Sequence, residues 1–195
     1  MTRFDIVADG GRDEDAPRTS DPLAPDSEPE DLLGTMLRAG ILTEGEDGDL
    51  YLTKEFESAW TGQMSTLRSL DQQKLIEATA QAVPFEAEGE RAYDGIRIEG
   101  QEGVAWLRPT NAIADVAAVL AMEAFDVPDY VRAPAATPLR LFTPECPSCG
   151  GDVVSTISRD GSPVPPESGR EANRKVLACT DCGAEVHELS AQVED

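Results

Sequence analysis

Two short stretches, Cys146-Pro-Ser-Cys149-Gly-Gly151 and Cys179-Thr-Asp-Cys182-Gly-Ala184, contain all four cysteines of the chain. In each stretch two residues separate the cysteines, and a glycine follows the second one. The spacing lets a tight turn point both sulfurs of a pair at one ion, and four thiolates complete the tetrahedral coordination of a structural Zn²⁺ site. The glycine permits a positive φ where the chain turns away from the metal. We therefore predict that Cys146, Cys149, Cys179 and Cys182 hold one structural Zn²⁺.

The segments around the cysteines are expected to form a small sheet. We predict strands at residues 152–158, 175–178 and 185–189, so that residues 145–190 form a rubredoxin-like zinc ribbon. The proline-rich stretch 161–169 is expected to be a flexible excursion from it. His187, the only histidine, could replace one sulfur. Because four cysteines already complete the coordination sphere, we interpret His187 as a strand residue.

The cysteine pattern C-P-x-C-G…C-x-x-C-G resembles that of the zinc-ribbon, or CPxCG-type zinc-finger, proteins common in haloarchaea. The run Leu50-Tyr-Leu-Thr-Lys-Glu-Phe-Glu-Ser-Ala-Trp60, with a later helix leading into the ribbon, is similar to a group of such proteins. The likeness covers roughly residues 30 to 190 and is specific at the cysteines. That group has no known activity, so the resemblance implies zinc and a fold.

The net charge is extreme, at −22 from 38 acidic and 16 basic residues, and only Lys54, Lys74 and Lys175 are lysines. The acidic residues are spread along the whole chain. In 1 M salt the Debye length falls to ~3 Å, so the self-repulsion of such a surface is screened. We therefore predict a halophilic protein. The alternative is a mesophilic protein whose acidic surface aids solubility.

The chain shows no segment that would carry it into or across a membrane. Its first ten residues lack an apolar region of the signal-peptide type. The most apolar stretch, residues 113–125, contains Asp115 and Glu123 and is too short to span a bilayer. We therefore expect a cytoplasmic location, where thiols stay reduced and paired C-x-x-C motifs favour a metal over disulfides.

Composition divides the chain into four parts. Residues 1–29 combine acids and prolines with few large apolar side chains, and are expected to be a disordered acidic tail. Residues 30–144 are predicted to form an α+β domain. The ribbon at 145–190 follows, and residues 191–195 form a short tail.

The first half of the α+β domain is predicted to be a helix, a hairpin and two further helices. Pro29 suits a first helical turn, and residues 41–43 and 50–52 flank the polar turn at 44–49 as a hairpin. Thr53 can cap the next helix, and Ser69 with Gln72 would form a capping box for another. The core face of the helix after Thr53 is predicted to hold Phe56, Trp60, Met64 and Leu67. The helix–hairpin–helix order resembles the later half of a winged helix.

The second half of the domain is predicted to contain one hairpin and one long helix. Residues 86–91 are expected to be a polar connector, and residues 95–99 and 104–108 to pair as strands. Thr110 would cap an amphipathic helix that places Ile113, Val116, Ala117, Leu120 and Ala124 on one face. Because residues 127–144 contain four prolines, they are interpreted as a packed connector. Its Leu139, Leu141 and Phe142 would seat the ribbon.

Charge argues against nucleic-acid binding, although winged helices often bind DNA. Affinity for DNA comes largely from Lys and Arg on phosphates. The helix before the first hairpin offers only Arg38, and the turn at 44–49 is acidic. Arg170, Arg174 and Lys175 form the densest basic cluster. They could contact an acidic partner or a phosphate backbone, but we interpret them as offsetting nearby thiolates and carboxylates.

The sequence gives catalysis little support. A nucleophilic arrangement would depend on His187, every cysteine is assigned to zinc, and no glycine-rich phosphate loop is present. We therefore predict a non-enzymatic zinc-binding protein that contacts a protein partner as an interaction or adaptor module. One alternative is a transcription-associated nucleic-acid-binding protein that uses the ribbon. A weaker one is a thiol oxidoreductase, although its C-x-x-C motif would need a helix start in a βαβ unit.

Overall fold

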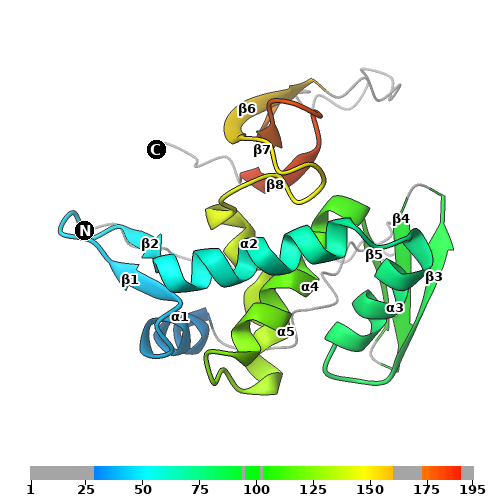
Figure 1. Cartoon of the computed structure of the whole chain (residues 1–195), viewed down its shortest axis with the longest axis horizontal. Coiled ribbons are helices and arrows are strands. Elements are labelled where there is room, and N and C mark those ends of the chain that lie inside the picture. Colours follow the sequence, from blue (N-terminus) through cyan, green and yellow to red (C-terminus); the bar gives the residue numbers. More distant parts are fainter. Residues whose placement is uncertain (1–28, 94, 102, 160–172, 190–195) are drawn as a thin grey trace, which may run out of the picture.

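The computed structural model describes residues 29–93, 95–101, 103–159 and 173–189. Within these residues helices and three small antiparallel sheets make an α+β fold, as predicted (Figure 1). The predictions for the acidic N-terminal tail, for 161–169, for Arg170 and for 191–195 lie outside this part of the chain. Among the described helices, none is both long and apolar enough to cross a membrane.

The first elements follow the sequence pattern closely. Helix α1 (Pro29–Arg38) leads into the hairpin of β1 (Leu42–Glu44) and β2 (Leu50–Leu52), and α2 (Lys54–Arg68) follows. Thr53 is the N-cap of α2, and its hydroxyl accepts a hydrogen bond from the backbone N–H of Phe56, 3.4 Å away. This bond satisfies one of the free donors of the first helical turn.

Helix α4 (Pro109–Glu123) is the centre of the core, because α2, α3, α5 and the middle sheet all contact it. Its small side chains let these neighbours approach closely. The Trp60 indole is fully buried, and its Nε1–H donates a 2.9 Å bond to the carbonyl oxygen of Ala114. The Phe56 ring meets Phe125 edge-on at 5.4 Å. The predicted core face of α2 is therefore confirmed: Phe56, Trp60, Met64 and Leu67 are all buried.

The predicted capping box at Ser69 and Gln72 is wrong. Helix α3 (Gln72–Ala82) is capped by Asp71, whose carboxylate accepts a 3.0 Å bond from the backbone N–H of Lys74. Ser69 instead ends α2, and its N–H donates to carbonyls of the last turn of that helix. Asp71 immediately precedes the first residue of α3, whereas Ser69 is three positions before it. The Asp71 carboxylate also places a negative charge at the positive end of the helix dipole.

The middle sheet has one more strand than predicted. The segment expected to be a polar connector is β3 (Ala87–Ala92), which pairs with β4 (Gly95–Gly100), and β4 pairs with β5 (Gly103–Leu107). The β3 sequence is rich in Glu and Gly, which have poor strand propensity. Pairing with β4 and packing against α3 override that local preference.

The proline-containing segment after α4 is also more regular than predicted. It forms α5 (Asp129–Leu139), which continues into a single 3-10 turn, η1 (Arg140–Phe142). Pro134 and Pro138 lie inside α5 and remove two backbone donors, which usually disfavours a helix. The helix persists because its apolar face is buried in the core, at Val131, Ala133, Ala135, Ala136 and Leu139.

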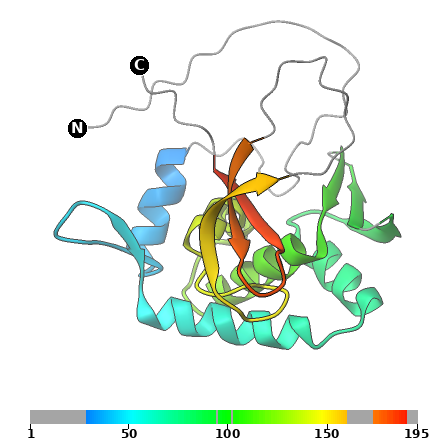
Figure 2. The same ribbon diagram turned by 90° about the horizontal axis from the view of Figure 1, so that it is seen from above.

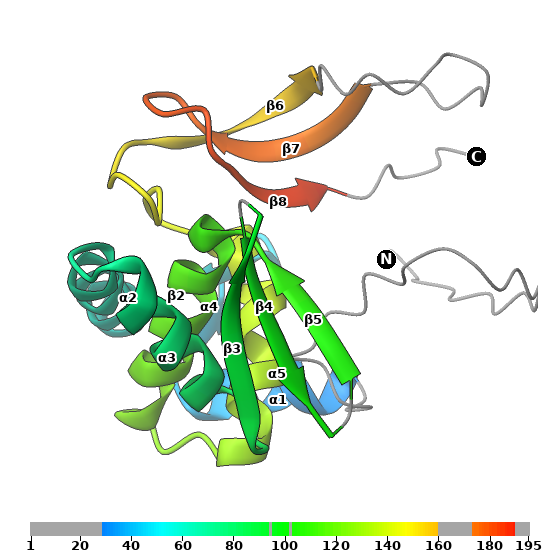
Figure 3. The same ribbon diagram turned by 90° about the vertical axis from the view of Figure 1, so that its right-hand side faces the viewer.

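The cysteine-bearing part forms a third sheet that lies over the rest of the chain (Figure 2, Figure 3). Its strands β6 (Val153–Arg159), β7 (Asn173–Cys179) and β8 (Glu185–Leu189) lie in the order β6-β7-β8 and are antiparallel. All three predicted strands are confirmed, within two residues at each end. Strand β8 contacts both α4 and η1.

Candidate metal centre

The structure brings all four predicted cysteine ligands together. Their sulfur atoms lie within 4.8 Å of one another. The Sγ atoms of Cys146 and Cys182 are 3.6 Å apart, and those of Cys149 and Cys179 are 3.5 Å apart. Cys146 and Cys179 are buried, whereas Cys149 and Cys182 are exposed. A group of this composition and size could hold a metal ion.

Two turns with the same hydrogen-bond pattern present the sulfurs. The N–H of Cys146 donates to the carbonyl of Gly151 at 2.8 Å, and the N–H of Gly150 donates to the carbonyl of Cys146 at 2.8 Å. In the second turn Cys179 bonds in the same way to Ala184 at 3.0 Å and to Gly183 at 3.1 Å. The repeated pattern shows that the C-x-x-C-G sequence determines the backbone of each turn locally.

Glycine is needed at specific positions of these turns. Gly150 has a φ of +79° and Gly183 a φ of +71°, in the left-handed region where a β-carbon is strained. These values confirm the positive φ predicted after each cysteine pair. At Gly151 a β-carbon would collide with the carboxylate of Asp181 in the opposite turn. The second glycine of the first turn therefore leaves room for the Asp181 side chain in its present position.

The surroundings of the thiols differ from one another. Burial raises the pKa of Cys146 to about 12. The backbone amide of Cys182 lowers the pKa of Cys179 to about 7, because an N–H that points at sulfur favours the thiolate. The N–H of Asp181 also donates to Cys179 Sγ, at 3.4 Å. N–H groups directed at sulfur are suited to neutralising thiolate charge around a bound cation.

Arg68, the last residue of α2, fastens the first cysteine turn to the helical part. Its Nε donates to the carbonyl of Pro147 at 3.0 Å, and its Nη2 donates to the carbonyl of Cys146 at 3.1 Å. Nη2 also forms a 2.7 Å ion pair with Glu145. One guanidinium thus holds three consecutive residues of the turn, including the backbone of a cysteine.

Thr110 also contacts this turn, although it was predicted to cap a helix. That prediction is wrong: α4 begins at Pro109, Arg108 is its N-cap residue, and no side chain caps it. Proline has no N–H, so one of the free backbone donors at the start of α4 is absent. The Thr110 hydroxyl is instead 2.6 Å from that of Ser148, between the two cysteines of the first pair.

A buried ion pair lies beneath the cysteine sheet. Arg140 Nε is 2.9 Å from Asp115 Oδ1, and the Asp115 side chain is 0% exposed. The Asn111 amide, oriented to satisfy both neighbours, accepts from Arg140 Nη1 at 2.8 Å and donates to the carbonyl of Val186 at 3.2 Å. This chain of polar contacts connects α4 and η1 to strand β8.

The other residues singled out in the sequence are not part of the sulfur group. His187 lies in β8 opposite Leu177, so it is a strand residue as predicted. Arg174 Nη1 forms a 2.7 Å ion pair with Glu188, which agrees with an offsetting role for this part of the basic cluster. Of the three residues expected to seat the ribbon, Leu139 is buried in the main core, while Leu141 is 46% exposed. Phe142 is partly buried against the main core, and the turn η1, which contains Leu141 and Phe142, contacts β8. The polar contacts of Arg68, Arg140 and Asn111 also join the two parts.

Together these features define an α+β protein in which a helical part carries a small sheet with a four-cysteine group. A family described as "Family of unknown function (DUF8054) central domain" matches residues 30–141, which is more than half of the chain. The chain therefore belongs to this family. The match ends before Cys146, so it covers the helical part and the middle sheet. No curated protein and no solved structure matches the chain.

Proposed function

We propose that this is a non-enzymatic zinc-binding protein whose four cysteines hold one structural Zn²⁺. The convergence of four sulfurs within 4.8 Å carries the proposal. Sulfurs bound tetrahedrally to one zinc ion at ~2.3 Å lie about 3.8 Å from one another. The separations of 3.5 and 3.6 Å in two of the pairs are close to that value.

The donor set supports a closed site. Four thiolates suit zinc or iron in a tetrahedral environment, and they leave no coordination position for water or substrate. In this proposal β6–β8 and the two cysteine turns form a rubredoxin-like ribbon of the haloarchaeal CPxCG kind. The metal would hold this ribbon in shape and would take no part in a reaction.

The proposed role of the chain is contact with a protein partner. The ribbon is fixed to the helical part by Arg68 and by the Arg140 network, so the two parts would present one continuous surface. The helix–hairpin–helix of α1, β1, β2 and α2 is compatible with part of a winged helix. Its turn carries Glu44, Glu46, Asp47 and Asp49, which disfavours phosphate contacts. Arg174 forms an ion pair with Glu188, so its charge is already partly neutralised. This further favours a protein partner over nucleic acid.

Metal analysis of the purified chain tests the proposal directly. We expect one zinc per chain, and we expect Cys149→Ser to lose it because one of four ligands is removed. His187→Gln is the matched control, since a strand residue outside the sulfur group should not change the zinc content. Iron in place of zinc, no metal at all, or zinc loss in His187→Gln would contradict the proposal.

We also propose that the chain is adapted to concentrated salt. Its net charge of −22 should destabilise the folded state in dilute buffer, because few basic residues offset the acids. The melting temperature is therefore expected to rise steeply between ~0.1 and ~2 M KCl, where the Debye length shortens to a few ångströms. Differential scanning fluorimetry across this range measures it. A flat or falling melting temperature would indicate an ordinary acidic protein.

A further inference from the structure

The β3–β4–β5 sheet has one covered face and one open face. Its inner face, which includes Ile96, Ile98, Ala105 and Leu107, is buried toward α3 and α4. The register places the remaining side chains in two rows on the outer face. Each row runs across the three strands. One row contains Glu88, Glu99 and Val104, and the other contains Glu90, Arg97 and Trp106.

Trp106 is unusually exposed for its size. Its side chain is 53% exposed, whereas Trp60, the other tryptophan, is fully buried. The Arg97 guanidinium lies 6.0 Å from the centre of the Trp106 ring. Ion pairs to Glu90 at 2.9 Å and Glu99 at 2.8 Å hold Arg97 in place. An exposed tryptophan on a rigid sheet is the kind of residue that dominates binding energy at protein interfaces.

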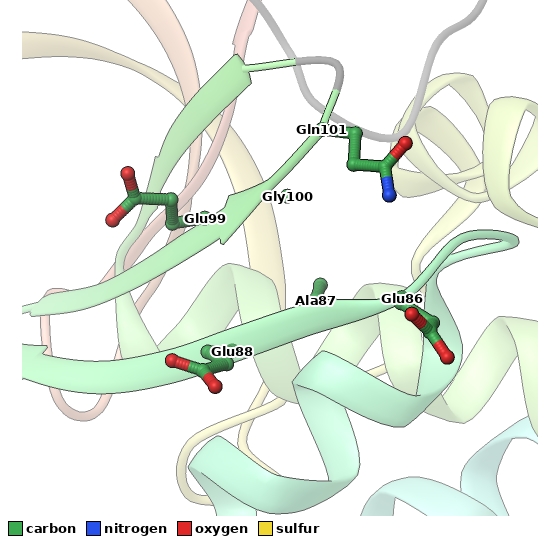
Figure 4. Close-up of a pocket in the computed structure, with 6 residues that line it drawn as sticks. All are labelled: Glu86, Ala87, Glu88, Glu99, Gly100 and Gln101. Atoms are coloured by element: carbon green, nitrogen blue, oxygen red, sulfur yellow. The ribbon is translucent and has the colours of Figure 1, made fainter.

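Carboxylates also gather at β3 and β4 of this sheet. Glu86, Glu88 and Glu99 line an open pocket of about 570 Å³, together with Gly100 and Gln101. Figure 4 shows Glu88 and Glu99 projecting from neighbouring strands on the same side. Arg97 neutralises part of the charge of Glu99, but Glu86 and Glu88 have no basic partner among the described residues. The outer face of the sheet therefore carries more carboxylates than basic groups among the described residues, and it is complementary to a cationic segment.

Strand β5 also offers a free edge. In the order β3-β4-β5 it is an outer strand, so only one of its edges is paired within the described part of the chain. Its sequence, Gly-Val-Ala-Trp-Leu, contains none of the charged residues or prolines that usually protect an edge from further pairing. The unpaired backbone groups can accept an additional strand.

We propose that this surface binds an extended basic segment of a partner protein, which adds as a fourth strand beside β5. An arginine or lysine of that strand lies over Val104 and extends along the row toward Glu99, and its neighbour on the same face contacts Trp106. The opposite face of the added strand continues the apolar row of Ala105 and Leu107. The ligand therefore alternates basic and apolar residues, because successive side chains of a strand point to opposite faces. This inference names the partner of the proposed adaptor role and does not depend on the metal.

A fluorescein-labelled peptide that alternates arginine with valine is the probe, titrated against the full zinc-loaded chain at the lowest salt at which it stays folded. A peptide that alternates arginine with proline has the same charge but lacks half of the backbone donors, so it separates strand addition from general attraction. Fluorescence anisotropy measures both affinities, and hydrogen exchange of residues 103–107 locates the contact. We expect the arginine–valine peptide to bind at least roughly tenfold more tightly and to protect these amides.

Two variants test the side chains. Trp106→Ala and Glu99→Lys are each expected to weaken binding of the arginine–valine peptide by roughly tenfold. Glu46→Lys, in the exposed turn between β1 and β2, is the control with the same charge change, and should keep most of the affinity. Zinc content is measured on every sample, so failure of the unmodified, zinc-loaded chain to bind the arginine–valine peptide overturns this inference alone. Equal binding of the two peptides, equal effects of Glu99→Lys and Glu46→Lys, or tighter Trp106-dependent binding of a single-stranded oligonucleotide would also overturn it.

Discussion

Cys179→Ser is expected to unfold the β6–β8 sheet while the helical part stays folded. The sheet has little core of its own: apart from its cysteines, the buried apolar residues of these strands are Val176, Ala178 and Val186. Structural zinc contributes about 10–16 kcal/mol to the folding of small zinc-finger peptides. The main core contains no residue of the sheet, because its buried cluster ends at Leu139. Loss of a ligand should therefore act on the sheet alone.

Hydrogen exchange with mass spectrometry would show this division. Protection should disappear at residues 153–159, 173–179 and 185–189 and persist in α4. A chelator added to the unmodified chain should reproduce the pattern. Thr156→Ser, a change at an exposed position of β6, is the control and should alter neither protection nor zinc content. A Cys179→Ser chain that keeps both its zinc and a protected sheet would show that these cysteines do not hold the metal.

Arg140→Met is expected to lower the free energy of unfolding by about 3–5 kcal/mol, because it removes the guanidinium that compensates the buried charge of Asp115. The Asp115 side chain is 0% exposed, so water cannot replace the lost interaction. The double variant Asp115→Leu/Arg140→Met replaces both charges with apolar groups of similar size. It should recover most of the lost stability, because the desolvation cost of the ion pair is removed as well.

Urea denaturation of the four chains of this double-mutant cycle measures the coupling. Arg38→Met provides the matched control, since Arg38 is exposed and hydrogen-bonds only to Thr35 among the described residues. That change should cost less than about 0.5 kcal/mol. The stabilising role of the ion pair would be contradicted if Arg140→Met lowered the free energy of unfolding no more than Arg38→Met does. It would also be contradicted if the double variant were less stable than Arg140→Met.

Local chemistry explains what could be predicted from the sequence. The cysteine turns, the Thr53 cap and the core face of α2 depend on spacings of a few residues, and each was found from its pattern. Strand β3 and helix α5 were missed because pairing with β4 and burial against α4 outweigh the local preferences of Glu, Gly and Pro.

The contacts that join the two parts could not be found from local pattern. Arg68 is 79 positions from Pro147, and nothing in the sequence around either residue indicates the contact. Asp115 gave a weak signal, since it is an acid in the middle of an apolar helix and such a charge needs a partner. Arg140 stands in an apolar segment and is that partner. Trp106 was interpreted only as a strand residue, because exposure depends on which face of the sheet the helices cover.

The Arg68 contacts have a thermodynamic consequence. Arg68 belongs to the α2 helix but binds the backbone carbonyl of Cys146, so it favours the turn conformation in which that sulfur faces the other three. Two events that share a conformation must favour each other by the same factor. If zinc binding strengthens the hydrogen bonds between Arg68 and the turn, then the folded helical part must raise the zinc affinity of the cysteines by the same factor. The metal affinity of the four cysteines would then depend on whether α2, which supplies none of the ligands, is correctly folded.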